Sequence, residues 1–307
     1  MQLFDECFLK VKTDCFNFIS SQETKIEKFK NKNRMIKSFL IPVCFWIKKK
    51  TNKKEPLIIG FAGGQGTGKT TITSIITIIL KKYFKLDVLK ISIDDFYKTR
   101  KQRALLSKNK HPFLMTRGVP GTHDINIMLN FFKKIKVKKF KSLKLPKFNK
   151  AVDDRYKQNL WYKIQSKPDV VIFEGWCVGA KPQSSKELKK PVNSLEKTHD
   201  QNFKWRQYVN NQLKTKYKKL FNQLDYILFL KAKNFSLLRR WRLKQENKLW
   251  LKFKDKKNLK VMNKSEVKNF MDTYQRITQQ MLKDMPKYSS IVMNLNNSHQ
   301  IKNIKYR

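Results

Sequence analysis

Short apolar runs that alternate with helical patterns dominate this chain of 307 residues. Between the runs, apolar residues recur at helical spacing, as they do from Thr71 to Leu80. Strands that alternate with helices favour an α/β fold with a doubly wound parallel sheet and helices on both faces. The runs that we interpret as buried strands are 57–61, 87–93, 168–173, 224–230 and 290–295.

The first fifty residues follow a helical pattern without such runs. We therefore expect a helical N-terminal extension, 1–52, that packs on a single α/β domain, 53–307. One domain is the simplest count for this length and for a hydrophobic content of 40%. Within it, a basic helical segment at about 235–262 precedes a last long helix at 264–285.

The turn after the first strand is rich in glycine and fits the pattern G-x-x-x-x-G-K-[ST]. Glycines let successive backbone N–H groups turn inward around phosphate oxygens. Lys69 can then reach the β and γ phosphates of a nucleotide, and the Thr70 hydroxyl can hold Mg²⁺. The residues that we expect to bind ATP are Gly63, Gly64, Gln65, Gly66, Thr67, Gly68, Lys69, Thr70 and Thr71.

All 9 glycines of the chain fall in three segments, 60–68, 118–121 and 175–179. Average usage of about 7% would give roughly 21 glycines in a chain of this length. A composition that avoids glycine elsewhere keeps it where a side chain does not fit. We therefore expect the three segments to form parts of one site.

Carboxylates follow two of the predicted strands. Asp94 and Asp95 come after the second strand, and Glu174 ends the third. In open parallel sheets, ligands bind at the edge where the carboxyl ends of the strands lie. Asp94 can accept the proton of an attacking hydroxyl, and Glu174 suits Mg²⁺ bound through water. A turn or a helix cap is the alternative interpretation of the two aspartates.

The loop HPFLMTRGVPGTHD, 111–124, combines residue types that favour a shaped loop over such a site. Its last residues begin a helix, with Asp124 as a candidate cap. His111 and His123 have two interpretations, a direct role in the site or a place on the solvated surface.

Arginine is scarce, with 11 residues against 58 lysines, and several arginines lie in motif-like stretches. Its planar fork suits phosphate and carboxylate groups. Three arginines on the basic segment would form a lid that closes on the transferred phosphoryl group, or else an ordinary solvated face. The candidate anion-binding residues are Arg117, Arg155, Arg239, Arg240 and Arg242.

The formal net charge of +46 and the pI near 10.2 suggest a nucleic acid or an anionic membrane surface as partner. The lysines, however, are spread over almost every segment. We therefore prefer a compositional bias towards lysine and keep nucleic acid as the alternative. No sequence feature indicates an oligomeric state.

The chain has no pattern of a secretory signal, and its longest apolar run, 39–47, is too short to span a bilayer. The four cysteines lack metal-type spacing and are expected to be reduced thiols. These features indicate a soluble cytoplasmic protein without a transmembrane segment.

Several segments together carry a resemblance to one enzyme family. In chain order they are GGQGTGKTT, SIDDFYKT, RGVPGTHD, PKFNK with DDR, VIFEGWCVG, WRQYVNNQL, FLKAKNFSLLRRWRLKQE and QQMLKDMP. Their order and spacing, from about residue 40 to the C-terminus, resemble the plant and cyanobacterial D-glycerate 3-kinases and their fungal relatives. That family lies within a larger group of P-loop kinases with uridine, pantothenate and phosphoribulokinases.

The resemblance implies a P-loop NTPase-type fold with a helical lid, ATP and Mg²⁺ as cofactors, and transfer of the γ-phosphoryl group to D-glycerate to give 3-phosphoglycerate. It implies Lys69, Asp94, Arg239 and Arg242 as catalytic residues, with Asp94 as the base. The implied metal site consists of Thr70, Asp94 and Glu174. The implied contacts to a glycerate-like hydroxy acid are Asp95, Tyr97, Arg117, His123, Asp124 and Arg155.

Two departures from the family pattern concern the acceptor. Asn149 stands where an aspartate is expected in P-x-[FY]-D-K, and the glycine-rich run before Arg155 is reduced to AVDD. Two alternatives stay open. One is a kinase of the same fold that acts on a nucleoside, pantothenate or a sugar phosphate. The other, suggested by the net charge of +46, is a non-enzymatic P-loop protein associated with nucleic acid.

Overall fold

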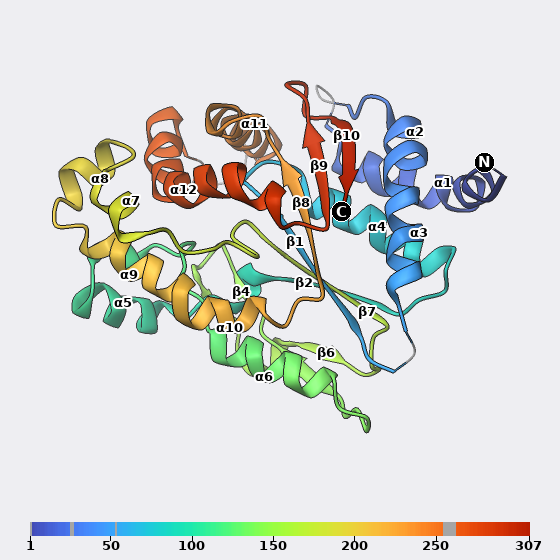
Figure 1. Cartoon of the computed structure of the whole chain (residues 1–307), viewed down its shortest axis with the longest axis horizontal. Helices are drawn as coiled ribbons and strands as arrows, with labels where there is room; N and C mark the ends of the chain where they lie inside the picture. Colours follow the sequence, from blue (N-terminus) through green and yellow to red (C-terminus); the bar gives the residue numbers. More distant parts are fainter. Residues whose placement is uncertain (1, 25–27, 53, 254–261) are drawn as a thin grey trace.

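The computed structural model describes residues 2–24, 28–52, 54–253 and 262–307. A six-stranded sheet with the order β10-β9-β8-β1-β7-β2 lies at its centre (Figure 1). Its strands are β1 (Leu57–Gly63), β2 (Val88–Ser92), β7 (Val170–Gly175), β8 (Tyr226–Lys231), β9 (Ile291–Leu295) and β10 (Ile301–Tyr306).

The strands from β9 to β2 pair in parallel, and β10 pairs antiparallel with β9. Alternate residues of β1 enter different cores: Ile59 and Phe61 pack on one face of the sheet, and Ile58 and Ala62 pack on the other. Because both faces are covered, the predicted doubly wound α/β fold is confirmed. The chain turns back after β9 and adds β10 as an antiparallel edge strand, which the sequence pattern did not indicate.

One face of the sheet packs on helices from the N-terminal half of the chain. In α1 the buried side chains Cys7, Val11, Cys15 and Ile19 recur every four residues, so that one stripe of the helix faces this core. The described part of the first fifty residues is mainly helical, as predicted. The helices are α1 (Gln2–Gln22), α2 (Lys32–Arg34), a π-helical turn (Met35–Leu40), α3 (Ile41–Lys50) and α4 (Lys69–Lys82).

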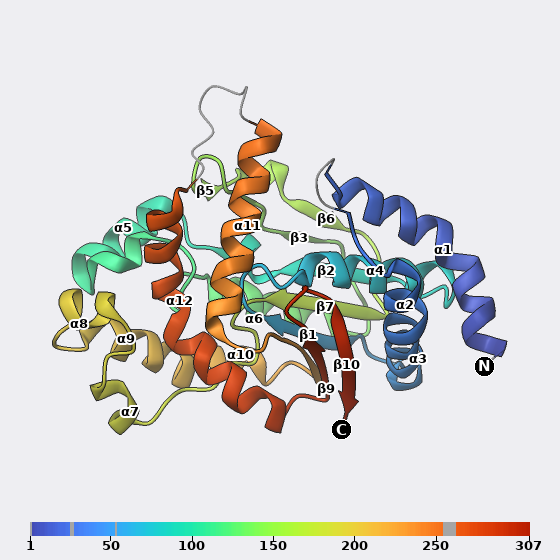
Figure 2. The ribbon, with the colours of Figure 1, turned by 90° about the horizontal axis from the view of Figure 1, so that it is seen from above.

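The other face packs on helices from the middle of the chain. These are α6 (Ile125–Ile135), α9 (Lys204–Gln212), a π-helical turn (Leu213–Tyr217) and α10 (Lys218–Phe221). The long helices α11 (Phe235–Phe253) and α12 (Lys264–Asp284) lie side by side near the end of the sheet where the glycine-rich loop is found (Figure 2). The predicted lid at about 235–262 includes residues 254–261, which lie outside the described residues.

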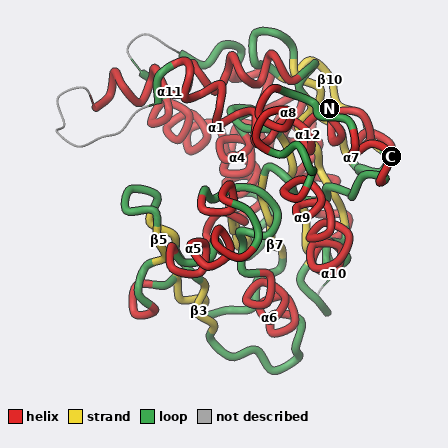
Figure 3. Tube along the Cα trace, turned by 90° about the vertical axis from the view of Figure 1, so that its left-hand side faces the viewer, coloured by secondary structure: helices red, strands yellow, loops and turns green. Residues whose placement is uncertain are grey.

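The lysine-rich segment after α6 forms short antiparallel ribbons, which the sequence pattern did not indicate. The ribbon strand β5 (Asp154–Arg155) lies beside helix α5 (Arg100–Asn109), and a hydrogen bond of 3.0 Å from the Arg100 N–H to the Asp154 carboxylate joins them (Figure 3). These elements are α5 (Arg100–Asn109), β3 (Leu143–Leu145), β4 (Phe148–Asn149), β5 (Asp154–Arg155) and β6 (Tyr162–Ile164). The remaining helices are α7 (Ser185–Lys189), α8 (Ser194–His199) and the 3-10 turns Ile93–Phe96, Pro112–Met115, Gln158–Leu160 and Met285–Lys287.

The four cysteines are buried, and no disulfide joins any of them within the described ranges. Among the helices that the structure describes, none combines the length and the apolar character needed to cross a bilayer.

Candidate active site

The three glycine-containing segments meet at the carboxyl ends of β1 and β7. The Thr70 hydroxyl donates a hydrogen bond to Glu174 Oε1 (3.1 Å), which joins the phosphate loop to the end of β7. The Trp176 indole N–H donates to the Gly118 carbonyl (2.8 Å), which joins the end of β7 to the RGVPGTHD loop. The three segments therefore lie together, as expected, and their function as one site stays a prediction.

The phosphate loop between β1 and α4 has the conformation that its glycines allow. Gly66 and Gly68 have φ angles of 76° and 85°, in the left-handed region that side chains rarely adopt. The Lys69 ammonium donates to the Gly64 carbonyl (2.9 Å) across the loop. Burial lowers the pKa of Lys69, and the nearby carboxylates Glu174 and Asp94 act in the opposite direction. A backbone cradle with one lysine at its mouth fits the phosphate groups of a nucleotide.

Thr70 and Glu174 fit a Mg²⁺ ion that keeps several of its water ligands. Glu174 is only 6% exposed, and its second oxygen accepts from the Thr73 hydroxyl (3.1 Å). Magnesium is commonly held by one or two carboxylates together with substrate phosphates rather than by a closed protein cage. In keeping with this, the described part of the chain contains no cluster of three acidic, histidine or cysteine side chains that could enclose a metal.

Asp94 lies one strand further along the same edge of the sheet, just after β2. Its Oδ1 accepts from the Tyr97 hydroxyl (2.9 Å), and its Oδ2 contacts the Lys150 ammonium (2.8 Å). Burial raises the pKa of Asp94, but the charge and hydrogen bond of Lys150 outweigh burial and leave the pKa below its usual value. Asp94 is therefore an ionised carboxylate, as a general base requires. For Asp95, burial raises the pKa to about 6.

His123 is buried behind Asp94 rather than placed on the solvated surface. It is 2% exposed, its ring stacks on Tyr97 at 4.5 Å between centroids, and its Nδ1 lies 2.6 Å from the Tyr217 hydroxyl. Burial lowers the pKa of His123 to about 3, so the imidazole is neutral at physiological pH. This stack holds Tyr97, and through it Asp94, in place.

Arg117 and Arg155, two of the candidate anion-binding residues, are engaged by protein groups. Arg155 donates from Nε (3.2 Å) and Nη2 (2.7 Å) to the Tyr97 carbonyl, and its Nη2 also pairs with Asp124 (3.4 Å). Arg117 pairs with Asp153. In addition, Asp124 accepts from the Ile127 N–H as the cap of α6. The two arginines thus fix the shape of the loops around the candidate base.

Helix α11 brings the candidate lid arginines to the phosphate loop. A Cβ atom added to Gly66 would lie 3.1 Å from the Arg242 backbone nitrogen, so the helix and the loop are in close contact. Arg239 pairs with Asp272 of α12 (2.7 Å), and Arg242 pairs with Glu246. Arg240 is exposed.

Sequence reasoning missed two side chains that lie next to the site, His299 and Lys150. His299, in the turn between β9 and β10, stacks on Trp241 at 4.2 Å and 19°, and its Nε2 is 3.7 Å from a Cβ added to Gly68. Lys150 contacts the candidate base. Only the PKFNK segment pointed towards Lys150, and no signal pointed to the hairpin that carries His299.

No family model matches the chain. It is 31% identical over 227 residues to an uncharacterized kinase, mug58, of Schizosaccharomyces pombe, and the match covers 72% of this chain and 79% of that protein. This chain belongs to the same family of P-loop kinases. The chloroplastic D-glycerate 3-kinase of Arabidopsis thaliana, another relative, is 30% identical over 227 residues, with 68% of this chain and 47% of that protein covered. The chain thus spans about half the length of that plant relative.

A solved structure supports the fold of this kinase family for the chain as a whole. The D-glycerate 3-kinase from Cryptococcus neoformans var. grubii superposes with a TM-score of 0.72 at 24% identity, over 88% of this chain and 97% of that chain. At this identity the superposition establishes the fold.

Proposed function

We propose that this P-loop kinase transfers the γ-phosphoryl group of ATP to a hydroxyl of D-glycerate, giving ADP and 3-phosphoglycerate. The observation that carries the proposal is the arrangement of Lys69, Glu174 and Asp94 on adjacent strand ends, where phosphate, metal and base functions meet. D-Glycerate as the acceptor rests on the relationship to the plant enzyme.

In the proposed reaction, backbone amides of the phosphate loop and the Lys69 ammonium neutralise charge on the β and γ phosphates. Asp94 accepts the proton of the acceptor hydroxyl as its oxygen forms the new bond to the γ phosphorus, while the bond from that phosphorus to the β–γ bridging oxygen breaks and releases ADP. Thr70 and Glu174, with Asp94 through water, would hold Mg²⁺, which when bound would supply positive charge that stabilises the negative charge of the transferred group.

We also propose that residues of α11 act as a lid during this reaction, in a kinase domain that extends over 53–307. In the structure Arg239 and Arg242 lie on the helix that touches the phosphate loop, each with a carboxylate partner. A guanidinium group can exchange such a partner for phosphate oxygens, since both present paired oxygen acceptors. The arginines would then stabilise the charge of the transferred group.

The test is ADP release from Mg·ATP by the purified protein with D-glycerate, uridine, pantothenate or ribulose 5-phosphate as acceptor. The proposal predicts that D-glycerate alone stimulates ADP release. Stimulation by another compound of the set would replace D-glycerate by that acceptor. An Asp94→Asn variant with near-normal turnover would remove Asp94 from the role of base.

A further inference from the structure

Lys150 differs from the other cations described above because it contacts the candidate base directly and its side chain is accessible to solvent. Its side chain is 62% exposed, and its ammonium lies 2.8 Å from Asp94 Oδ2. An ammonium group has three N–H donors, and within the described residues only the one to Asp94 has a protein acceptor. Two donors next to the base are therefore available to a bound molecule.

Three other cations described above already have protein acceptors. Lys69 donates to the phosphate loop, Arg155 to the Tyr97 carbonyl and Asp124, and Arg117 to Asp153. His123 is buried and neutral. Among these cations, Lys150 is therefore the one most accessible to a carboxylate of the acceptor.

The backbone that carries Lys150 is held in place by buried contacts. Lys150 lies in the turn between β4 and β5, where Asn149 Oδ1 accepts from the Ala151 N–H (3.0 Å). The guanidinium of Arg103, which is completely buried, donates to the Asp153 carbonyl (2.6 Å) and pairs with the Asp153 carboxylate (2.9 Å). These contacts fix the backbone of the turn, and the Lys150 side chain extends from it towards Asp94.

We infer that Lys150 binds the carboxylate of the acceptor and makes this kinase selective for hydroxy acids over neutral alcohols, an inference that rests on the proposed function. In a short hydroxy acid only a few bonds separate the carboxylate from the reacting hydroxyl. An acceptor whose hydroxyl approaches Asp94 thus places its carboxylate within reach of the ammonium that contacts the same aspartate. Asp94 and Lys150 would together recognise one hydroxyl and one carboxylate of the same acceptor.

The experiment compares D-glycerate with glycerol, which keeps the hydroxyl groups but lacks the carboxylate. Steady-state ADP release is measured for the wild-type protein and for Lys150→Met, Lys150→Arg and the control Lys144→Met. Lys144 lies on the neighbouring ribbon, is exposed, and faces Lys163 across the strand pair. The control therefore removes the same charge from the same part of the molecule without touching Asp94.

Lys150→Met should lower kcat/KM for D-glycerate by roughly 10- to 100-fold, mainly through KM, because a charge-assisted hydrogen bond to the bound acceptor is lost. Because Lys150 also lowers the pKa of Asp94, the rate with glycerol should fall as well, but the loss with D-glycerate should exceed the loss with glycerol by about 10-fold or more. Lys150→Arg should restore most of the D-glycerate activity, and Lys144→Met should match the wild type for both acceptors.

An equal loss with both acceptors, or unchanged D-glycerate kinetics, would overturn the inference. If the wild-type protein does not turn over D-glycerate, the proposed function fails, and calorimetric D-glycerate binding to the wild type and Lys150→Met then decides the inference separately. Weaker binding by the variant supports it, whereas equal binding, or no binding to either protein, refutes it.

Discussion

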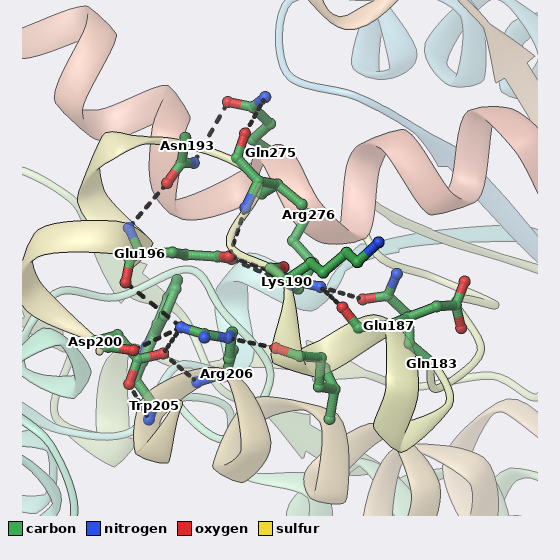
Figure 4. Close-up of polar contacts among 12 residues, drawn as sticks. Gln183, Glu187, Lys190, Asn193, Glu196, Asp200, Trp205, Arg206, Gln275 and Arg276 are labelled. Atoms are coloured by element: carbon green, nitrogen blue, oxygen red, sulfur yellow. Dashed lines mark hydrogen bonds and ion pairs between the residues drawn. The ribbon is translucent and has the colours of Figure 1, made fainter. Parts of the chain in front are cut away.

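A buried ion-pair network attaches α8 to α12, and we predict that a single uncharged substitution in it costs a large part of the stability of the protein. Glu196 is completely buried and accepts from Arg276 Nε (2.7 Å) and Nη2 (2.6 Å) (Figure 4). The remaining Arg276 donors reach the Glu187 carbonyl, the Lys190 carbonyl and Gln183 Oε1, so that the guanidinium is fully satisfied.

The magnitude of the effect follows from burial. Glu196→Gln keeps the shape of the side chain but leaves the charge of Arg276 without its partner inside the protein. Removing one partner of a buried pair costs about 3 kcal/mol or more. For a chain of 307 residues, an unfolding entropy of about 2.1 cal/mol/K per residue converts this loss into a decrease in Tm of about 5 °C.

The assay is urea unfolding for the free energy and thermal unfolding for Tm, both followed by circular dichroism, with Glu266→Gln as the matched control. Glu266 lies on α12 as well, is exposed, and closes a capping box with Asn263, so its substitution should cost about 1 kcal/mol or less. The double variant Glu196→Leu with Arg276→Met should be more stable than the sum of the two single changes indicates, because neither charge is then left unpaired. If Glu196→Gln cost no more than the control, the reasoning about this network would be refuted.

Three further predictions concern the site itself. Lys69→Ala should abolish acceptor-dependent ADP formation with an unchanged circular dichroism spectrum, because the lysine is proposed to neutralise phosphate charge and donates to a loop carbonyl in the structure; a retained rate would contradict the proposed role. Gly118→Ala should lower stability by about 2 kcal/mol in thermal unfolding, since φ is 138° and the new methyl group would overlap the Tyr274 hydroxyl; an unchanged Tm would show that the loop yields. Burial raises the pKa of Asp95 to about 6. The protonated carboxyl therefore makes its full contribution to folding stability below the unfolded pKa near 3.8, and this contribution is lost as the pH rises through 6. Asp95→Asn should therefore gain stability over the wild type, by up to about 2 kcal/mol, between pH 4 and pH 7 in urea titrations, and a pH-independent difference would argue against a buried carboxylate.

The features that the sequence predicted well are local ones. The strands β1, β7 and β8 are short apolar runs, so their burial can be recognised from the run itself without knowledge of the segments that cover it. The glycine spacing of the phosphate loop is likewise a pattern within nine residues. Parallel strands place their carboxyl ends together, so the meeting of Asp94 and Glu174 followed from the order of the elements.

The features that the sequence did not predict depend on contacts between distant segments. Strand β10 reads as polar, because it lies at the sheet edge and most of its side chains face solvent. The burial of Arg103 depends on acceptors up to 50 residues away along the chain. In the same way, the role of Lys150 depends on a turn whose position is fixed by that arginine. In a chain so rich in lysine, the local sequence does not show which lysine faces the site.

Phosphorus NMR of the product formed from ATP and D-glycerate tests the proposed activity itself. The proposed function predicts one 3-phosphoglycerate for each ADP released, and none in the Lys69→Ala variant. ADP accompanied only by inorganic phosphate, or a phosphate on a different acceptor, would contradict it.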